Sequence, residues 1–337
     1  MKIGILSSGG DCPGINAAIR GVAKTATIHH GMEVIGIHNG FPGLMTEDVI
    51  PLNEESLSGI LTLGGTILGT SREKPFKKLL ATKESPKIIK QHYDNLQLDC
   101  LVCIGGNGTQ KTALQLSELG LNIIGVPKTI DNDVWGTDVT FGFNTAVDIA
   151  TEAIDRLHST ATSHRRVMVI ELMGHNAGWI ALHAGMAGGA DVIVLPELEY
   201  REQVIIDAII RRLEKGKSYS IVAVAEGVKT PEKENMRPAA YLSRIIEQGT
   251  GLEARETVLG YIQRGGSPSP FDRNLSTRLG GHATELIANR KFGRMVRLKD
   301  NEISSISLDK VAGKLKLVTP EDDLVIQGIR MGISFGI

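Results

Sequence analysis

The chain has 337 residues, of which 42% are hydrophobic and 22% are charged, a composition typical of a globular protein large enough for two domains. Its 37 basic and 38 acidic side chains nearly cancel, and no basic tract with interleaved aromatic residues predicts a nucleic-acid partner. Because the sequence has no run of about 18 apolar residues, we expect no membrane span.

Cysteine usage favours a reducing, cytoplasmic setting, since only Cys12, Cys100 and Cys103 are present. Cys100 and Cys103 have the C-x-x-C spacing of some metal and redox sites. They lie inside an apolar run, however, and no second pair of Cys or Cys/His has matching spacing. We therefore predict that both are buried structural thiols.

In chain order, short β-branched runs alternate with longer amphipathic stretches. The predicted strands are residues 2–6, 33–37, 99–104, 121–126, 166–172, 191–195 and 220–227. Continuous apolar strands separated by helices predict parallel sheets with helices on both faces. Because the alternation continues through most of the chain, we predict two such sheets, with a helix at about residues 143–161 leading from the first to the second.

Three glycine-rich turns follow predicted strands: SSGGDCPG (7–14), LGGTILGTSR (63–72) and GGNGT (105–109). Glycine lets backbone N–H groups approach a bound phosphate, and the next helix contributes the positive end of its dipole. The Walker pattern and the G-x-G-x-x-G dinucleotide fingerprint are both absent. The second strand also lacks the terminal carboxylate that would hold a ribose, so a nicotinamide oxidoreductase is disfavoured.

The apolar run 121–126 is followed by Lys128, Thr129, Asp131 and Asp133. In an extended segment the two aspartates lie on the same side and can point into one cleft. Phosphoryl transfer to a sugar hydroxyl needs a carboxylate that accepts the hydroxyl proton, with cations and amides around the phosphate. One aspartate would act on the hydroxyl while the other holds the substrate or magnesium. An Asx-rich turn that caps a helix is the alternative, but it leaves the lysine and threonine unexplained.

Five segments resemble the 6-phosphofructokinases: GGDCPGINAAIR (9–20), GGTILGTSR (64–72), PKTIDNDVWGTD (127–138), AIDRLHSTATSHRR (153–166) and RETVLGYIQRGGSPSPFDR (255–273). The similarity runs from residue 1 to about residue 290. It implies an α/β protein of two similar Rossmann-like, three-layer domains with mostly parallel sheets and an active site in the cleft between them. A larger, ATP-binding domain would comprise residues 1–141 plus about 254–305. A smaller, sugar-phosphate-binding domain would comprise residues 142–253 plus about 306–337.

The resemblance also implies roles for individual residues. Asp131 would be the general base toward the 1-hydroxyl of fructose 6-phosphate. The donor would contact Gly10, Arg72, Gly106, Asn107, Gly108, Thr109 and Lys128, with Phe41 offering a flat face to adenine. The sugar phosphate would contact Thr129, Asp133, Arg166, Met173, Gly174, His175, Glu226, Arg255, Tyr261 and Arg264. Mg²⁺ would be held by Asn107 and Asp133. In this family Arg166 and Arg255 belong to sites that a neighbouring subunit completes, so a homotetramer is expected.

The donor site departs from the family pattern at two positions. Asn107 replaces the usual magnesium-associated aspartate, so we expect weaker Mg²⁺ affinity but not loss of activity. Gly108 is typical of ATP-dependent members, whereas Lys128 is typical of pyrophosphate-dependent ones. Gly108 leaves room for the α-phosphate of a nucleotide, and an extra ammonium does not exclude one. We therefore favour ATP, with pyrophosphate as the alternative donor.

Other departures concern the sugar and regulation. His175 and Tyr261 stand where an arginine and a histidine are usual. Either the substrate is unchanged, or the preference has moved toward another sugar, such as a longer phosphorylated ketose. Glu54 stands where an effector-binding arginine is expected, which predicts weak control by ADP and phosphoenolpyruvate. A non-catalytic sugar-phosphate-binding homologue is a further alternative, but the intact sequence TIDND argues against it.

Overall fold

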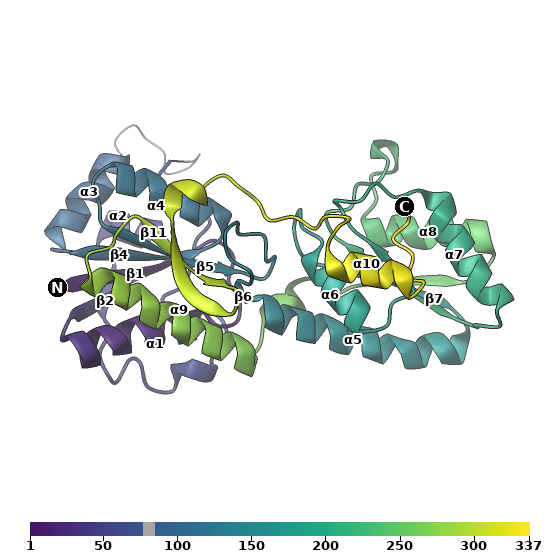
Figure 1. Ribbon diagram of the computed structural model, residues 1–337, viewed down its shortest axis with the longest axis horizontal. Coiled ribbons are helices and arrows are strands. Elements are labelled where there is room, and N and C mark those ends of the chain that lie inside the picture. The colour runs from purple at the N-terminus through teal and green to yellow at the C-terminus, as the bar shows by residue number, and fades with distance from the viewer. Residues whose placement is uncertain (77–84) are drawn as a thin grey trace. The chain divides into compact units, whose positions relative to one another are not determined.

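A computed structural model of the protein describes residues 1–76 and 85–337. These residues form two compact units. The first unit comprises Met1–Thr145 and Arg264–Lys316, and the second comprises Ala146–Gln263 and Leu317–Ile337. Figure 1 shows that each unit is an α/β layer structure with its own sheet.

The first unit is built on a mostly parallel sheet in the order β12-β11-β5-β4-β1-β2-β3, with the short strand β6 beside β5. Only β3 and β12 run antiparallel to their neighbours. The strands are β1 (Lys2–Ser8), β2 (Glu33–Ile37), β3 (Val49–Pro51), β4 (Cys100–Gly105), β5 (Ile123–Thr129), β6 (Phe141–Gly142), β11 (Arg294–Lys299) and β12 (Glu302–Ser307).

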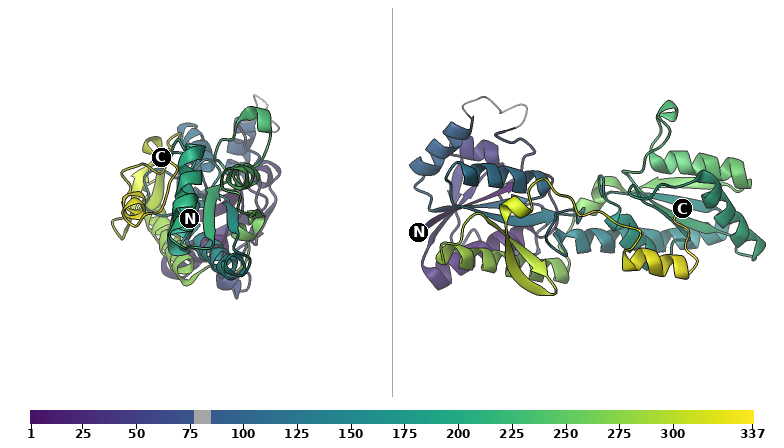
Figure 2. Two further views of the ribbon diagram at one scale, coloured as in Figure 1. Left: turned by 90° about the vertical axis from the view of Figure 1, so that its right-hand side faces the viewer. Right: turned by 45° about the horizontal axis from the view of Figure 1, so that its top comes forward.

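Helices cover both faces of this sheet (Figure 2). One face carries α2 (Phe41–Thr46), α3 (Ser85–Asn95) and α4 (Asn107–Glu118), whose apolar side chains form a buried core with β1, β2 and β4. The other carries α1 (Ile15–Lys24) and α9 (Pro270–Ala288), which lie side by side. Shorter turns are the π-helix η1 (Thr25–His29) and the 3₁₀ segments η2 (Ile60–Thr62) and η5 (Leu308–Lys310).

The second unit has a smaller, wholly parallel sheet in the order β10-β7-β9-β8. Its strands are β7 (Val167–Leu172), β8 (Val192–Val194), β9 (Ser220–Ala225) and β10 (Ala254–Val258). Its helices are α5 (Phe143–His164), which begins at the end of the first unit, α6 (Trp179–Ala187), α7 (Glu202–Glu214), α8 (Pro238–Thr250) and α10 (Asp323–Arg330), with η3 (Glu232–Glu234) and η4 (Gly260–Arg264).

The predicted fold class is confirmed, and every predicted strand is present within three residues of its expected bounds. Cys100 and Cys103 are buried free thiols in β4, as predicted. No helix within residues 1–76 and 85–337 is long and apolar enough to span a bilayer. The expected domain bounds need correction, however. Residues 254–263 belong to the second unit because β10 pairs with β7. Residues 306–316 stay with the first unit, whose strand β12 ends at Ser307.

Candidate active site

Three glycine-rich turns of the first unit meet at the carboxyl ends of β1 and β4. They are residues 8–10, 69–72 and 106–109, and we call them the glycine edge. Gly9 N donates to Ser71 O at 2.8 Å, and Thr70 Oγ1 donates to Gly9 O at 2.8 Å. Thr109 Oγ1 donates to Ser8 O at 3.3 Å. These bonds join turns that lie far apart in the sequence, at the edge where parallel α/β sheets bind ligands.

The turn 106–109 opens helix α4, which begins at Asn107. The amino end of that helix therefore directs its positive dipole end toward the glycine edge. Gly108 is exposed, and a Cβ added there would overlap the Nζ of Lys74. Lys74 thus brings an ammonium group to this turn, which the sequence pattern did not indicate. Arg72, at the neighbouring turn, is exposed.

Lys128 is the largest polar side chain buried beside these turns, with 2% of its surface exposed. Its Nζ donates to Ser8 O at 3.0 Å and also to Gly10 O. Burial lowers the pKa of Lys128, while nearby acidic groups, including Asp11, oppose that shift. Because its ammonium is committed to two carbonyl oxygens, Lys128 holds the first glycine turn against β5.

The loop after β5 carries Asp131 in a fixed turn. Asn132 has φ 53°, in the left-handed region, so the segment is not extended as predicted. The side chain of Asn132 maintains this turn, because its Oδ1 accepts hydrogen bonds from Thr140 N and Lys316 Nζ, each at 3.0 Å. Asp131 N donates to Thr129 Oγ1 at 3.1 Å. The two aspartates are therefore placed by a hydrogen-bonded bend and not by strand alternation.

Asn107 and Asp133, the predicted magnesium ligands, are neighbours. Asn107 Nδ2 donates to Asp133 O at 3.2 Å. Its Oδ1 is buried and has no hydrogen-bond partner among the residues that the structure describes. Mg²⁺ prefers oxygen ligands. The Asn107 side chain offers such an oxygen, and its amide nitrogen holds it next to Asp133. These two residues are thus suited to the ion.

Phe41 does not offer an adenine platform. It is fully buried in the core of the first unit, packed with residues of β2 and β4. Its position explains the error: Phe41 begins α2 directly after Gly40, whose φ of 70° turns the chain so that the ring points inward. The Phe41 ring is therefore part of the hydrophobic core, and the predicted contact with adenine is wrong.

Arg264 lies against the first glycine turn. A Cβ added at Gly10 would lie 2.8 Å from a terminal nitrogen of Arg264. The resemblance assigned this arginine to the sugar phosphate, whereas its contact here is with the turn expected to hold donor phosphates. Arg264 therefore brings positive charge to the glycine edge.

The second unit has a cavity of about 270 Å³ at the carboxyl ends of β7, β9 and β10. It is lined by Glu171, Leu172, Met173, Glu226, Arg237, Val258, Gly260 and Tyr261. Three of these, Met173, Glu226 and Tyr261, are predicted sugar-site residues. Tyr261 is 73% exposed, so its hydroxyphenyl group reaches solvent at this cavity.

We call this cavity the sugar cavity, after the predicted sugar-site residues that line it. Backbone contacts explain its shape. Glu226 Oε1 accepts hydrogen bonds from Gly174 N at 3.3 Å and His175 N at 2.8 Å. Gly174 has φ 148°, which only glycine adopts readily. The side chain of Gln263 is fully buried, and its Oε1 accepts a hydrogen bond from Met173 N at 2.8 Å. Part of the predicted set, namely Met173, Gly174, His175, Glu226 and Tyr261, therefore lies around one cavity, and the unpredicted Gln263 supports it.

Glu171 and Arg237 also line the sugar cavity and were not predicted. Glu171 is 5% exposed, and burial raises its pKa, although the N–H of Ala239 and the charge of Arg237 oppose the shift. Arg237 Nη1 lies 3.8 Å from the Glu171 carboxylate. The signal for Glu171 was its place near the end of a buried strand. Arg237 carried no comparable signal, because it follows a loop far along the chain.

Arg166 and Arg255 lie at the opposite edge of the same sheet. Arg166 directly precedes β7, and Arg255 is the second residue of β10, opposite Met168. Both guanidinium groups bind the carboxylate of Glu253. The six residues of β7 separate Arg166 from Met173, and at about 3.3 Å per residue that is roughly 20 Å. These arginines therefore do not reach the sugar cavity of their own unit.

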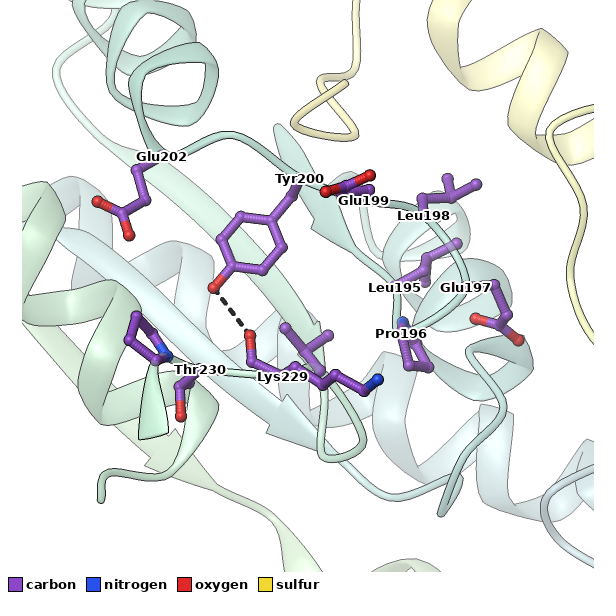
Figure 3. A pocket seen from close by; sticks show the side chains of 11 residues that line it. Leu195, Pro196, Glu197, Leu198, Glu199, Tyr200, Glu202, Lys229 and Thr230 are labelled. Carbon is purple, nitrogen blue, oxygen red and sulfur yellow. Dashed lines mark hydrogen bonds between the residues drawn. The ribbon is translucent and has the colours of Figure 1, made fainter. Parts of the chain in front are cut away.

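A larger cavity of about 550 Å³ follows β8 and β9 (Figure 3). Tyr200 Oη donates to Lys229 O across it at 3.1 Å. Its lining includes three carboxylates, Glu197, Glu199 and Glu202, against the single ammonium of Lys229. This charge balance opposes the binding of a phosphate in the larger cavity.

Comparisons with known proteins show the family of the chain. The family model described as phosphofructokinase matches residues 2–287. The chain belongs to the phosphofructokinase family. It is 66% identical over 338 residues to a Bacteroides thetaiotaomicron protein named ATP-dependent 6-phosphofructokinase 3, covering 100% of both chains. A Spirochaeta thermophila protein named ATP-dependent 6-phosphofructokinase is 53% identical over 354 residues, covering 99% of this chain and 97% of that relative.

The fold is also that of a solved phosphofructokinase. The structure of the Saccharomyces cerevisiae enzyme superposes with a TM-score of 0.82 at 31% identity. The match covers 92% of this chain and 45% of the yeast chain, so this chain corresponds to less than half of that protein.

Proposed function

We infer that this phosphofructokinase transfers a phosphoryl group from ATP to the 1-hydroxyl of fructose 6-phosphate, giving fructose 1,6-bisphosphate in glycolysis. The observation that carries this inference is the 66% identity over the full length to a relative named for ATP-dependent 6-phosphofructokinase activity. We propose the glycine edge and the sugar cavity as the two ligand sites that such a reaction requires.

Asp131 is the proposed general base. It follows β5, and its turn is held by Asn132 and by the Thr129 hydroxyl. A carboxylate that is already in place costs little reorganisation when it accepts the proton of the attacking hydroxyl. Because the transfer itself needs positioning more than covalent chemistry, this rigid turn is the feature that a catalytic site would require.

The donor phosphates are proposed to bind along the glycine edge, against Gly10, Arg72 and residues 106–109. Amide groups at the start of α4 and the cations of Lys74 and Arg264 would oppose the negative charge of the phosphates. Lys128 acts at one remove by holding residues 8–10. Asn107 and Asp133 are proposed to hold Mg²⁺, which when bound neutralises charge on the donor.

Fructose 6-phosphate is proposed to bind in the sugar cavity of the second unit, at Met173, Gly174, His175, Glu226 and Tyr261. Arg166 and Arg255 would complete the corresponding cavity of a neighbouring subunit, since they sit at the far edge of their own sheet. This arrangement supports an obligate oligomer, which we propose to be a homotetramer. The first unit would thus bind the donor and the second unit the sugar phosphate.

The donor is the part of the proposal that an assay tests directly. Initial rates with fructose 6-phosphate and Mg²⁺ are measured with ATP, ADP, GTP and pyrophosphate at equal concentrations. We expect the highest rate with ATP, because Lys128, the residue typical of pyrophosphate use, is committed to Ser8 and Gly10. A higher rate with pyrophosphate would make this a pyrophosphate-dependent enzyme, and no turnover with any donor would favour the non-catalytic alternative.

A further inference from the structure

Two adjacent histidines and a glutamate meet on the helical face of the first unit formed by α1 and α9. The possible ligand atoms of His29, His30 and Glu285 all lie within 4.8 Å of one another. His30 Nε2 is 2.9 Å from Glu285 Oε1. The two imidazole rings have centroids 4.7 Å apart and are nearly perpendicular.

The backbone at this point departs from an α-helix in a way that permits the cluster. The side chains of consecutive residues in an α-helix point about 100° apart, so two neighbouring histidines do not normally bind the same metal ion. Here α1 passes into the π-helical turn η1, and His30 ends it with φ −116° and ψ −3°. Such π-helical turns are rare and frequently occur at functional sites.

Glu285 is supplied by α9, which is fixed closely against α1. A Cβ added at Gly280 would lie 2.6 Å from Ala18 O, and one added at Gly21 would lie 2.8 Å from Thr277 O. Thr284 Oγ1 also donates to Val22 O at 3.1 Å. Glu285 directly follows Thr284, which contacts α1, so its backbone is held firmly in place. A rigid backbone of this kind supports a set of metal ligands.

We propose that His29, His30 and Glu285 form a binding site for a divalent transition metal ion of the zinc type. Two imidazole nitrogens and one carboxylate oxygen suit Zn²⁺ or Co²⁺ and leave a fourth position for water. Tetrahedral ligands at about 2.1 Å from the ion lie about 3.4 Å apart. To reach this value, the 2.9 Å contact between His30 Nε2 and Glu285 Oε1 would lengthen, and the exposed His29 ring would turn toward the other two ligands.

This site is separate from the proposed magnesium site. The chain leaves the glycine edge after β1, runs along α1 and returns through η1 before β2 begins at Glu33. His29 and His30 therefore lie toward the amino ends of the strands, whereas Asn107 follows the carboxyl end of β4. A metal ion here would join η1 to α9 and stabilise the folded protein by binding only to it.

The test uses the full-length protein with saturating Mg²⁺, so that the hard-oxygen site is occupied, and Co²⁺ as a visible-absorbing probe. We expect one equivalent of Co²⁺ to give a saturable absorption band that Zn²⁺ removes. His29→Gln and Glu285→Gln should weaken Co²⁺ binding about tenfold or more, because even outer-shell changes have effects of that size. Zn²⁺ should also raise the melting temperature of the unaltered protein but not that of the variants.

His38→Gln is the matched control. His38 Nδ1 pairs with Asp48 at 2.8 Å, but the pair belongs to no three-ligand group among the described residues. This variant should bind Co²⁺ like the unaltered protein. His29 is exposed, so His29→Gln should fold normally, which its metal-free melting temperature verifies. Absence of a saturable band, or equal Co²⁺ affinity in His29→Gln, would overturn the site and leave an ordinary His30–Glu285 ion pair.

Discussion

Lys128 is a buried ammonium group that binds two backbone carbonyl oxygens. An ammonium group removed from water is costly unless it is paired. Here Ser8 O and Gly10 O provide acceptors, and in return the lysine fixes the first glycine turn. The residue that looked like a marker of pyrophosphate use is thus part of the framework of the donor site.

This role predicts the effect of Lys128→Met. The substitution removes the lysine donor from Gly10 O and leaves Ser8 O with the Thr109 hydroxyl as a donor. Loss of the hydrogen bond to Gly10 O costs about 1–3 kcal/mol of unfolding free energy. It should also raise the KM for ATP more than that for fructose 6-phosphate, because the turn it releases is in the first unit. Urea denaturation and steady-state kinetics measure both effects. Lys90→Met, which removes only an exposed pair with Asp94, should change neither. Equal loss in both variants would contradict the proposed role.

Glu171 predicts a pH effect of definite sign. Burial raises its pKa above the ordinary value of 4.5, so the folded protein holds this proton at a pH where the unfolded chain has released it. Its contribution to stability is therefore present below about pH 4.5 and is lost as pH rises through the folded pKa. Glu171→Gln removes this loss. The stability of the variant relative to the unaltered protein should increase as pH rises from about 4 to 7. Chemical denaturation at a series of pH values measures the difference, and a flat or falling difference would show that Glu171 does not titrate in this way.

At the scale of elements, the close contact between α1 and α9 depends on which glycine of α9 faces α1. Gly280 faces the α1 backbone so closely that no side chain fits, whereas a Cβ at its neighbour Gly281 would meet only Thr25 Oγ1 at 3.6 Å. The two glycines are equivalent in sequence terms, since both lie in the interior of α9. Only their orientation separates a packing requirement from a replaceable residue.

Two substitutions test this contact. Gly280→Ala should lower the unfolding free energy by about 1–3 kcal/mol, because the helices must move apart. Gly281→Ala should be neutral or raise it by up to about 1 kcal/mol, because alanine favours the helix. Thermal and urea denaturation give both values. If both substitutions had the same effect, the close approach of the two helices would be wrong.

The same scale explains which strands could be predicted. The buried strands β1, β4, β5, β7 and β9 are continuous apolar runs, which a sheet covered on both faces produces directly. Strands β11 and β12 mix polar and apolar residues because they form a partly exposed edge hairpin. Strand β10 reads ARETV and is largely exposed, so its place beside β7 is evident only from the pairing. That pairing moved the unit boundary.

For the whole molecule, the position of Arg166 and Arg255 is the basis of the proposal that active sites are shared between subunits. Arg166 directly precedes β7 and Arg255 lies near the start of β10, whereas the sugar cavity is at the carboxyl ends of these strands. If each site takes these arginines from a neighbour, inactive variants should complement one another in mixed oligomers. Asp131→Asn should lose about 10²- to 10⁴-fold in kcat as a general-base variant. Arg255→Ala should lose affinity for the sugar phosphate.

Mixing these two variants after subunit exchange should restore activity, because some sites would then combine an intact Asp131 with an intact Arg255 from the other chain. The matched control mixes Asp131→Asn with a chain carrying both substitutions, which provides no intact site. Activity is measured at subsaturating fructose 6-phosphate, and affinity tags verify that mixed oligomers form. Mixed oligomers that remained as inactive as the control would show that each chain completes its own site.

The sequence by itself determined the two parallel sheets, the glycine turns and the position of the loop that carries Asp131, because burial on both faces and tight turns at strand ends restrict residue type locally. Met173, Gly174 and Glu226 were grouped by the family resemblance, and the structure places them together at strand ends. Tertiary structure decided the rest. Phe41 is in the core, Lys128 is bound by carbonyl oxygens, and Asn132 bends a segment expected to be extended. Each of these depends on partners distant in the chain, such as Lys316 and Gly10, and contacts of that kind leave no periodicity in the sequence.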